Sequence, residues 1–220
     1  MKNIKAIIFD AYGTLFDVNS AAEKCKDKIG IKWEDFANYW RTTQLEYTWL
    51  RSLMKRHKDF WQITEDSLDK SMKVFKINTM HRKDLLDLYK ILPTFNEVPK
   101  VLKILKENKF KLLILSNGTP ELLNQLVIDN NLKNIFDDIL SIEEVRIFKP
   151  SSEVYDLPLK KYNFEKEQIA FLSANTWDVS GAGNFGYESI WVNRYKNVFD
   201  YLDFQPKFEL KNLSDLLKLL

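Results

Sequence analysis

Residues 5–15 read KAIIFDAYGTL, and this stretch decides the fold. Its apolar, β-branched run from Lys5 to Phe9 predicts a buried strand of a parallel sheet, which ends in the carboxylate of Asp10. Open α/β sheets bind their ligands at the carboxyl ends of the strands. We therefore expect Asp10 at the mouth of a pocket. Two residues later stands Tyr12, at a position where a second acid would serve a different chemistry.

The composition is that of an ordinary globular protein. Of the 220 residues, 45% are hydrophobic and 29% are charged, which suffices for one substantial core. The 33 basic and 31 acidic residues nearly balance, so we expect no nucleic-acid partner. The apolar runs are too short for a membrane span or a signal peptide. A lone cysteine, Cys25, excludes an intrachain disulfide, and together these features predict a cytoplasmic protein without a membrane partner.

Two kinds of pattern divide the chain. Residues 17–93 show only helical periodicity, and aromatic residues concentrate there between Trp33 and Trp61. This pattern predicts an all-helical subdomain with a small core of its own. The expected helices are 20–29, 33–55, 64–75 and 81–91.

Strands alternate with helices in the rest of the chain. Residues 111–115, 169–172 and 189–192 read as buried strands, with weaker candidates at 139–140 and near Phe208. Residues 214–220 read as a short amphipathic helix. The alternation predicts an α/β fold with a Rossmann-like parallel sheet, formed by residues 1–16 and 94–220. Because residues 17–93 leave directly after the first strand, we expect them to form an inserted helical cap over its carboxyl edge.

Polar residues follow three of the expected strands. Asp10 follows the first strand, Ser116 and Asn117 follow the second, and the stretch from Ser173 to Asp178 follows another. Lys149 approaches from a loop before Pro150. Each of these features alone is a common turn or surface feature, whereas their convergence at one sheet edge predicts an active site.

Four stretches carry a resemblance to a known family. They read FDAYGTL at 9–15, LSNG at 115–118, FKP at 148–150 and LSANTWD at 172–178. In this order they resemble the motifs of the haloacid dehalogenase superfamily, specifically its L-2-haloacid dehalogenase branch. The likeness covers essentially the whole chain, and the last stretch is specific to this branch. The resemblance implies a haloacid dehalogenase-like fold and hydrolysis of short L-2-haloalkanoic acids to D-2-hydroxy acids and halide, by an (S)-2-haloacid dehalogenase.

The resemblance also implies a mechanism. Asp10 attacks C2 of the substrate and forms an ester, and water then attacks the carboxyl carbon of Asp10, so that C2 is inverted once. Lys149, oriented by Tyr155 and Ser173, supplies the cation that Asp10 needs beside the substrate carboxylate. The implied catalytic residues are Asp10, Thr14, Arg41, Ser116, Lys149, Tyr155, Ser173, Asn175 and Asp178, with Asp178 as partner of the hydrolytic water. The implied substrate-binding residues are Ala11, Tyr12, Arg41, Leu45, Phe60, Ser116, Asn117 and Trp177, with Arg41, Asn117 and Trp177 around the halide.

Two positions depart from the pattern of the branch. Thr42 stands where a glutamine usually follows Arg41, and this change could alter substrate preference. Pro158 lies inside the expected helix that carries Tyr155, where it should kink that helix.

Tyr12 favours dehalogenation over phosphate-ester hydrolysis. A phosphatase of the superfamily needs an acid at this position to protonate the leaving alkoxide, and Mg²⁺ to screen the phosphate. A halide leaves without a proton, and fixed cations and N–H groups suffice for a monoanionic haloacid. We therefore expect no metal and no cofactor. Two alternative functions remain open: a hydrolase acting on a phosphorylated metabolite, and a non-catalytic binding relative. Assembly as a homodimer also remains open.

Other motifs have simpler explanations. Residues 181–186 read GAGNFG, but they do not open a helix directly after a strand, so they predict tight helix packing rather than a dinucleotide site. His57 and His81 lack ligand-like spacing, and we expect both at surface positions on cap helices.

Overall fold

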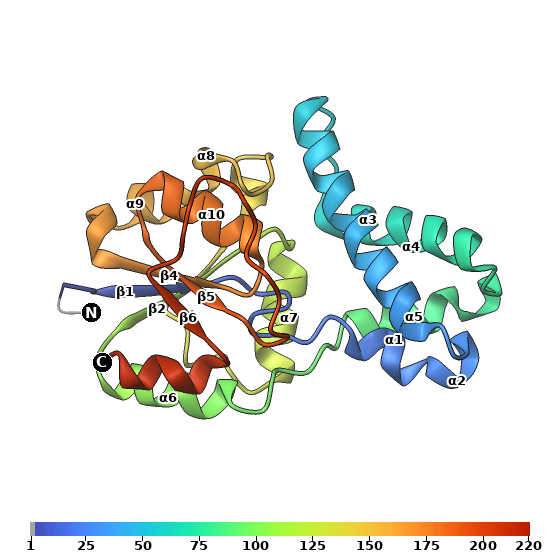
Figure 1. Ribbon diagram of the computed structural model, residues 1–220, viewed down its shortest axis with the longest axis horizontal. Helices are drawn as coiled ribbons and strands as arrows, with labels where there is room; N and C mark the ends of the chain where they lie inside the picture. Colours follow the sequence, from blue (N-terminus) through green and yellow to red (C-terminus); the bar gives the residue numbers. More distant parts are fainter. Residues whose placement is uncertain (1–2) are drawn as a thin grey trace.

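The structure is a computed structural model that describes residues 3–220, with a sheet core and a separate helical cap (Figure 1). All strand pairs are parallel, in the order β3-β2-β1-β4-β5-β6. The predicted α/β parallel sheet is confirmed. The strands are β1 Ala6–Phe9, β2 Lys111–Ser116, β3 Asp138–Ser141, β4 Ile169–Ser173, β5 Glu188–Val192 and β6 Phe208–Leu210.

Strand β1 occupies the middle of the sheet, which positions its carboxyl end. Phe9 pairs with Ile114 of β2 on one side and with Leu172 of β4 on the other. Every residue of β1 is buried, as the apolar run predicts. The residues that follow β1, β2 and β4 therefore meet at one edge.

Helices cover both faces of the sheet, which explains its continuous apolar strands (Figure 1). The C-terminal helix η4 packs with α6 on one face, and α10 packs on β4 and β5 on the other. The core helices are α6 Val98–Glu107, α7 Pro120–Asp129, α8 Ser152–Tyr155, α9 Leu157–Lys161 and α10 Thr176–Phe185, with 3₁₀ helices η2 Ile142–Glu144, η3 Lys166–Gln168 and η4 Leu213–Lys218.

The cap packs five α-helices and one 3₁₀ helix around an aromatic centre. Phe36 lies 5.8 Å from Phe75 and 6.0 Å from Trp40 between ring centroids. Such pairs add to the apolar area that holds α3 against α4. The cap elements are α1 Ser20–Lys24, α2 Lys26–Ile29, α3 Trp33–Leu53, α4 Phe60–Phe75, η1 Thr79–His81 and α5 Arg82–Tyr89.

The two chain segments that join core and cap run side by side. Asp17 N donates to the Pro93 carbonyl at 2.9 Å, and Phe95 N donates to the Leu15 carbonyl at 3.1 Å. Phe16 and Thr94 form an isolated antiparallel bridge between these bonds. These contacts support residues 17–93 as the proposed limits of the cap.

Some sequence predictions about single elements are wrong. Helix α4 begins at Phe60 rather than residue 64, because Asp59 caps it by accepting from Gln62 N at 2.8 Å. The short helix predicted at 214–220 is present as the 3₁₀ helix η4, Leu213–Lys218, and is thus confirmed. The expected kink at Pro158 is confirmed, since the helix breaks at Asp156 into α8 and α9.

His57 also differs from the prediction. It lies in the loop between α3 and α4 rather than on a helix, with its side chain only 13% exposed. His81 ends the short helix η1 and is half-buried. Neither histidine is a fully exposed surface residue.

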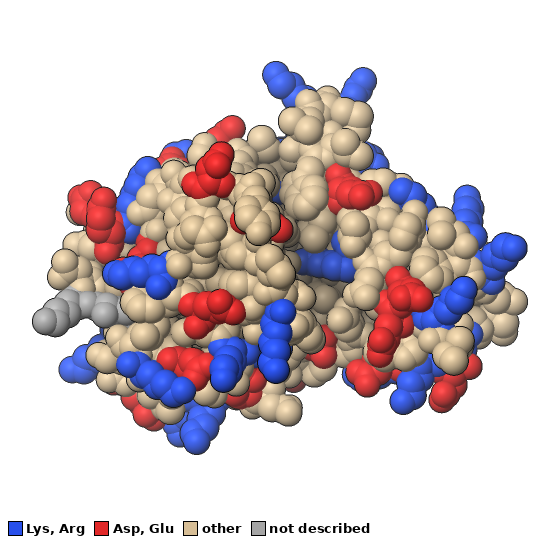
Figure 2. Space-filling view, in the orientation of Figure 1, with Lys and Arg blue, Asp and Glu red and all other residues tan. Residues whose placement is uncertain are grey.

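The surface carries both signs of charge. Acidic and basic side chains intermingle over the face drawn in Figure 2, as the balanced composition predicts. Among residues 3–220, no helix has the length and apolar character needed to span a membrane.

Candidate active site

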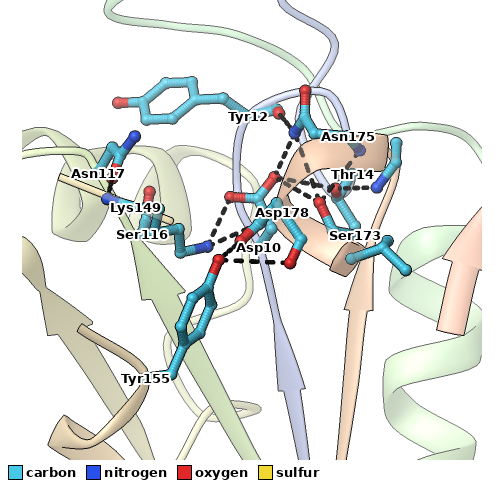
Figure 3. A network of polar contacts seen from close by, with 12 residues as sticks. Asp10, Tyr12, Thr14, Ser116, Asn117, Lys149, Tyr155, Ser173, Asn175 and Asp178 are labelled. Carbon is cyan, nitrogen blue, oxygen red and sulfur yellow. Dashed lines mark hydrogen bonds and ion pairs between the residues drawn. The ribbon is translucent and has the colours of Figure 1, made fainter. Parts of the chain in front are cut away.

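Asp10 follows β1 and is 5% exposed at the carboxyl edge of the sheet. Its Oδ2 accepts from Thr14 Oγ1 at 3.0 Å and from Asn175 Nδ2 at 2.9 Å. Ser173 Oγ is more distant, at 3.5 Å. Its Oδ1 faces Lys149 Nζ at 3.2 Å (Figure 3). Neutral donors thus hold one carboxylate oxygen, whereas the other faces a cation.

Lys149 bridges two carboxylates inside the protein. Its side chain is fully buried, and Nζ lies 2.9 Å from Asp178 Oδ2 as well as 3.2 Å from Asp10 Oδ1. A buried ammonium group needs such partners, because desolvation disfavours its charged form. With both carboxylates ionised, the three groups carry a net charge of about −1.

Tyr155 and Ser173 act on the carboxylates. We predicted that they orient Lys149, but Tyr155 OH donates to Asp178 Oδ1 at 2.7 Å. Ser173 Oγ lies near Asp10 and accepts from Asn175 N at 3.1 Å. Their connection to Lys149 therefore runs through Asp10 and Asp178.

The buried carboxyl of Asp178 has a perturbed pKa. Burial raises its pKa to about 6 against the opposing charge of Lys149, and the nearby charge of Asp10 adds to the rise. Burial, with the neighbouring Asp178, also raises the pKa of Tyr155 well above its ordinary value. Tyr155 is thereby kept as a hydrogen-bond donor at neutral pH.

The residues after β2 form a second wall of the site. Ser116 is fully buried and its Oγ accepts from Gly118 N at 3.1 Å. Asn117 Oδ1 accepts from the backbone N of Lys149 at 3.0 Å, which turns Nδ2 away from Lys149. Within residues 3–220, Asn117 Nδ2 has no acceptor. This amide can therefore donate to a ligand.

Tyr12 and Phe60 form an apolar contact between core and cap. Their ring centroids lie 5.1 Å apart, and both residues are almost completely buried beside the buried Ala11. Gly118 permits the position of Tyr12, because a Cβ there would lie 2.8 Å from the tyrosine ring. The buried Tyr12 hydroxyl has no partner in the described part of the chain.

Arg41 and Leu45 lie one turn apart on α3 and are both half-buried. Arg41 Nη1 donates to Gln44 Oε1 at 2.7 Å. No hydrogen bond joins Arg41 to a core residue in the described chain. The neighbouring Thr42, which departs from the branch, is exposed.

Trp177 ties the site to the cap. It lies in the first turn of α10, and its ring meets Trp49 of α3 edge to face at 5.5 Å. Trp49 Nε1 is buried without a partner among residues 3–220. Trp49 was not predicted, although it follows Arg41 and Leu45 at four-residue intervals on the same helix, which was a usable signal.

Two further polar contacts join cap and core beside Lys149. Phe148 N donates to Ser52 Oγ of α3 at 3.2 Å. His57 Nε2 lies 2.9 Å from Glu143 Oε2 of η2, and its ring packs on Phe148 at 5.4 Å. His57 and Glu143 lie 86 positions apart in the chain, and Ser52 and Phe148 lie 96 apart. No local sequence pattern predicts either pair.

The GAGNFG stretch packs α10 closely against its neighbours. A Cβ on Gly181 would lie 2.6 Å from Pro150 Cβ and 2.7 Å from Tyr155 OH, and one on Gly183 would overlap Phe204. These glycines lie within α10 rather than before it. The predicted tight packing of this helix is present, but the close contacts of these glycines are with Pro150, Tyr155 and Phe204 rather than with the sheet.

No metal cluster accompanies these residues. Over residues 3–220, no three His, Cys, Asp or Glu side chains gather where they could hold an ion.

Comparison with known proteins identifies the family. The profile of haloacid dehalogenase-like hydrolases matches residues 4–186. The (S)-2-haloacid dehalogenase of Pseudomonas sp. strain YL is 39% identical over 221 residues, which cover 100% of this chain and 95% of the relative. The chain therefore belongs to the haloacid dehalogenase-like hydrolases.

Solved structures agree with this assignment. A crystal structure of a dehalogenase has 33% identity and a TM-score of 0.97, covering 100% of this chain and 98% of the other. The L-2-haloacid dehalogenase of Xanthobacter autotrophicus with chloropropionic acid covalently bound has 31% identity and a TM-score of 0.91, covering 98% of both chains. The shared architecture includes the sheet and the helical cap.

Proposed function

We propose that this protein is an (S)-2-haloacid dehalogenase, which hydrolyses short L-2-haloalkanoic acids to D-2-hydroxy acids and halide. The observation that carries the proposal is the geometry of Asp10, whose Oδ1 is 3.2 Å from a buried ammonium group while Oδ2 accepts two shorter hydrogen bonds. The full-length similarity to relatives of that name supports it.

In the first step, Asp10 attacks C2 of the substrate. Oδ1 is the nucleophilic oxygen, because within residues 3–220 it accepts only from Lys149, whereas Oδ2 is held by Thr14 and Asn175. The new C–O bond forms as the carbon–halogen bond breaks, and the bonding electrons leave with the halide. Attack from the side opposite the halogen inverts C2.

Donors around the substrate stabilise the charges of this step. Ser116, with backbone N–H groups near Ala11 and Tyr12, receives the substrate carboxylate. Asn117 Nδ2, Arg41 and the edge of Trp177 surround the departing halide. Preorganised donors of this kind lower the barrier because they need no reorientation during the reaction. Tyr12, Leu45, Phe60 and Trp177 form the apolar wall.

In the second step, water attacks the carboxyl carbon of Asp10. Asp178 accepts a proton from this water, for which its raised pKa of about 6 suits it near neutral pH. Thr14 and Asn175 donate to Oδ2, where negative charge develops. The bond between the carboxyl carbon of Asp10 and the alkoxide oxygen then breaks, and the alkoxide takes the proton from Asp178 and leaves as the hydroxy acid. The new carboxyl group of Asp10 loses its remaining proton to solvent, which regenerates the carboxylate.

Chloride release from L-2-chloropropionate in the presence of a chelator tests the proposal. We expect stoichiometric chloride and D-lactate, and no product from the D-substrate. A strict Mg²⁺ requirement, with turnover of a phosphorylated metabolite instead, would contradict it. Asp10→Asn is the matched variant, because it keeps the shape of the side chain and removes the nucleophile.

The cellular compartment and the oligomeric state of the protein are also proposals. The lone Cys25 supports a reducing compartment such as the cytoplasm. Assembly as a homodimer is tested by light scattering after size-exclusion chromatography, where a mass near 52 kDa, about twice that of the 26.1 kDa chain, supports a dimer.

A further inference from the structure

Arg41 stabilises a departing halide best when its guanidinium group is already in place. Its long side chain has many rotamers, and fixing them costs conformational entropy. A cation that moves during the reaction stabilises the transition state less than a preorganised one. A group that holds Arg41 in the free enzyme would therefore contribute to the rate.

Gln44 holds Arg41 within the cap by a short hydrogen bond, and the Tyr89 hydroxyl lies beside the same guanidinium group. Gln44 is 1% exposed, and its Oε1 accepts from Arg41 Nη1 at 2.7 Å. Its Nε2 donates to Thr64 Oγ1 at 2.6 Å and to Tyr89 OH at 3.1 Å. Gln44 thus joins α3 to α4 and α5.

The orientation of the Gln44 amide is fixed by its neighbours. Thr64 Oγ1 donates its proton to the Phe60 carbonyl at 2.7 Å, so it can only accept from Gln44. The nitrogen of Gln44 must therefore face Thr64, which leaves the oxygen for Arg41. A reversed amide would place its nitrogen against a guanidinium group that has no acceptor.

The network also reaches the loop that carries the nucleophile. Tyr89 stacks on Tyr12 with ring centroids 5.8 Å apart and an interplanar angle of 23°. Tyr12 in turn packs on Phe60, the residue whose carbonyl anchors Thr64. A continuous set of contacts thus connects Arg41 to the loop that follows Asp10.

This part of the cap is too tight to be a ligand site. Arg41, Gln44, Tyr89 and Trp40 line a cavity of about 10 Å³, which holds about one water molecule. Gln44 and Tyr89 therefore bond to other groups of the cap rather than to a substrate.

We propose that Gln44 is a positioning residue that holds Arg41 for the leaving halide, an inference that rests on the proposed dehalogenase function. Gln44 does not touch the substrate, and its effect passes through Arg41. A misplaced Arg41 impairs departure of chloride, the poorer leaving group, more than departure of bromide.

The test compares Gln44→Met with wild type in single-turnover halide release from L-2-chloropropionate and L-2-bromopropionate. We expect the rate to fall about 30-fold with the chloro substrate and about tenfold with the bromo substrate, so their ratio changes about threefold. The inhibition constant for bromide should rise about tenfold. Gln62→Met is the matched control, since Gln62 lies in the same cap and its side chain bonds, among residues 3–220, only to Asp66.

A structural role alone would lower both rates equally and leave bromide inhibition unchanged, and that result would overturn the inference. Tyr89→Phe, which removes one partner of the Gln44 amide, should change the rate ratio and bromide inhibition in the same direction but less. If Gln44→Met does not fold, as shown by loss of its cooperative thermal transition, the rate ratio and the bromide inhibition of Tyr89→Phe test the inference instead. Halide release by wild type separates the two proposals, because its absence contradicts the dehalogenase function itself.

Discussion

Lys149 Nζ lies 3.2 Å from Asp10 Oδ1, although 139 positions separate the two residues in the chain. The lysine side chain is fully buried and that of Asp10 is 7% exposed. Because water cannot screen this pair, the ammonium group is the main counter-charge for a nucleophile that must meet an anionic substrate. The two residues form the electrostatic centre of the site.

Replacing Lys149 by Met should nearly abolish turnover. The change leaves Asp10 and Asp178 buried without their shared cation, and we expect a loss of about 1000-fold, equivalent to about 4 kcal/mol. Initial rates of halide release measure it. Lys160→Met is the control, since Lys160 pairs with Asp156 at the surface. Retention of a tenth or more of wild-type turnover would show that Lys149 is dispensable.

Hydrolysis of the ester should accelerate as pH rises toward about 6. The raised pKa of Asp178 keeps its carboxyl protonated below that pH, and only the ionised form can take a proton from water. In the ester Asp10 has lost the charge that helps to raise this pKa, so the rise in rate is centred below the free-enzyme value of about 6. Quenched-flow measurement of ester decay checks this, and a rate independent of pH between about 4 and 7 would count against Asp178 as the base.

Tyr155→Phe should move that pH dependence upward. Tyr155 OH donates to Asp178 at 2.7 Å and so favours the ionised carboxylate. Its loss raises the pKa of Asp178 further, and the rise in rate then occurs at higher pH. The same ester-decay profile is the measurement. Tyr162→Phe, which removes a hydroxyl bonded to the distant Asp138, should leave the midpoint unchanged; an unchanged midpoint in Tyr155→Phe refutes the coupling.

Glu143→Ala should weaken closure of the cap. It removes the partner of His57 at 2.9 Å and frees the loop that contacts Phe148, next to Lys149. We expect KM to rise about fivefold, as for the loss of one hydrogen bond, with a smaller change in kcat. Steady-state kinetics with L-2-chloropropionate measures both constants. Glu144→Ala, an exposed neighbour, is the control, and equal effects of the two variants would contradict a specific contact.

The sheet and the strand-end residues were predictable because their signals are local. The apolar run before Asp10 requires a buried parallel strand, and parallel strands bring their carboxyl ends together. Asp10 and Asp178 could thus be expected near one another, whereas the place of Lys149 beside Asp10 was implied by the family resemblance. The limits of the cap at residues 17 and 93 and the chemical roles of the site residues remain predictions.

The contacts between distant segments were not predictable. The pairing of His57 with Glu143 depends on how the cap packs on the core, and no local periodicity encodes it. Gln44 gave a partial signal, since it follows Trp40 by one turn on the buried side of α3, where a polar side chain needs partners. The start of α4 was missed because the capping role of Asp59 was not recognised.

A single turnover in ¹⁸O-water tests the central claim most directly. With enzyme in excess over L-2-chloropropionate, the account predicts that heavy oxygen enters the carboxylate of Asp10, while the first lactate released contains none. Mass spectrometry of lactate and of the peptide that contains Asp10 reads both outcomes. Heavy oxygen in the first lactate, with an unlabelled Asp10, would contradict the ester intermediate.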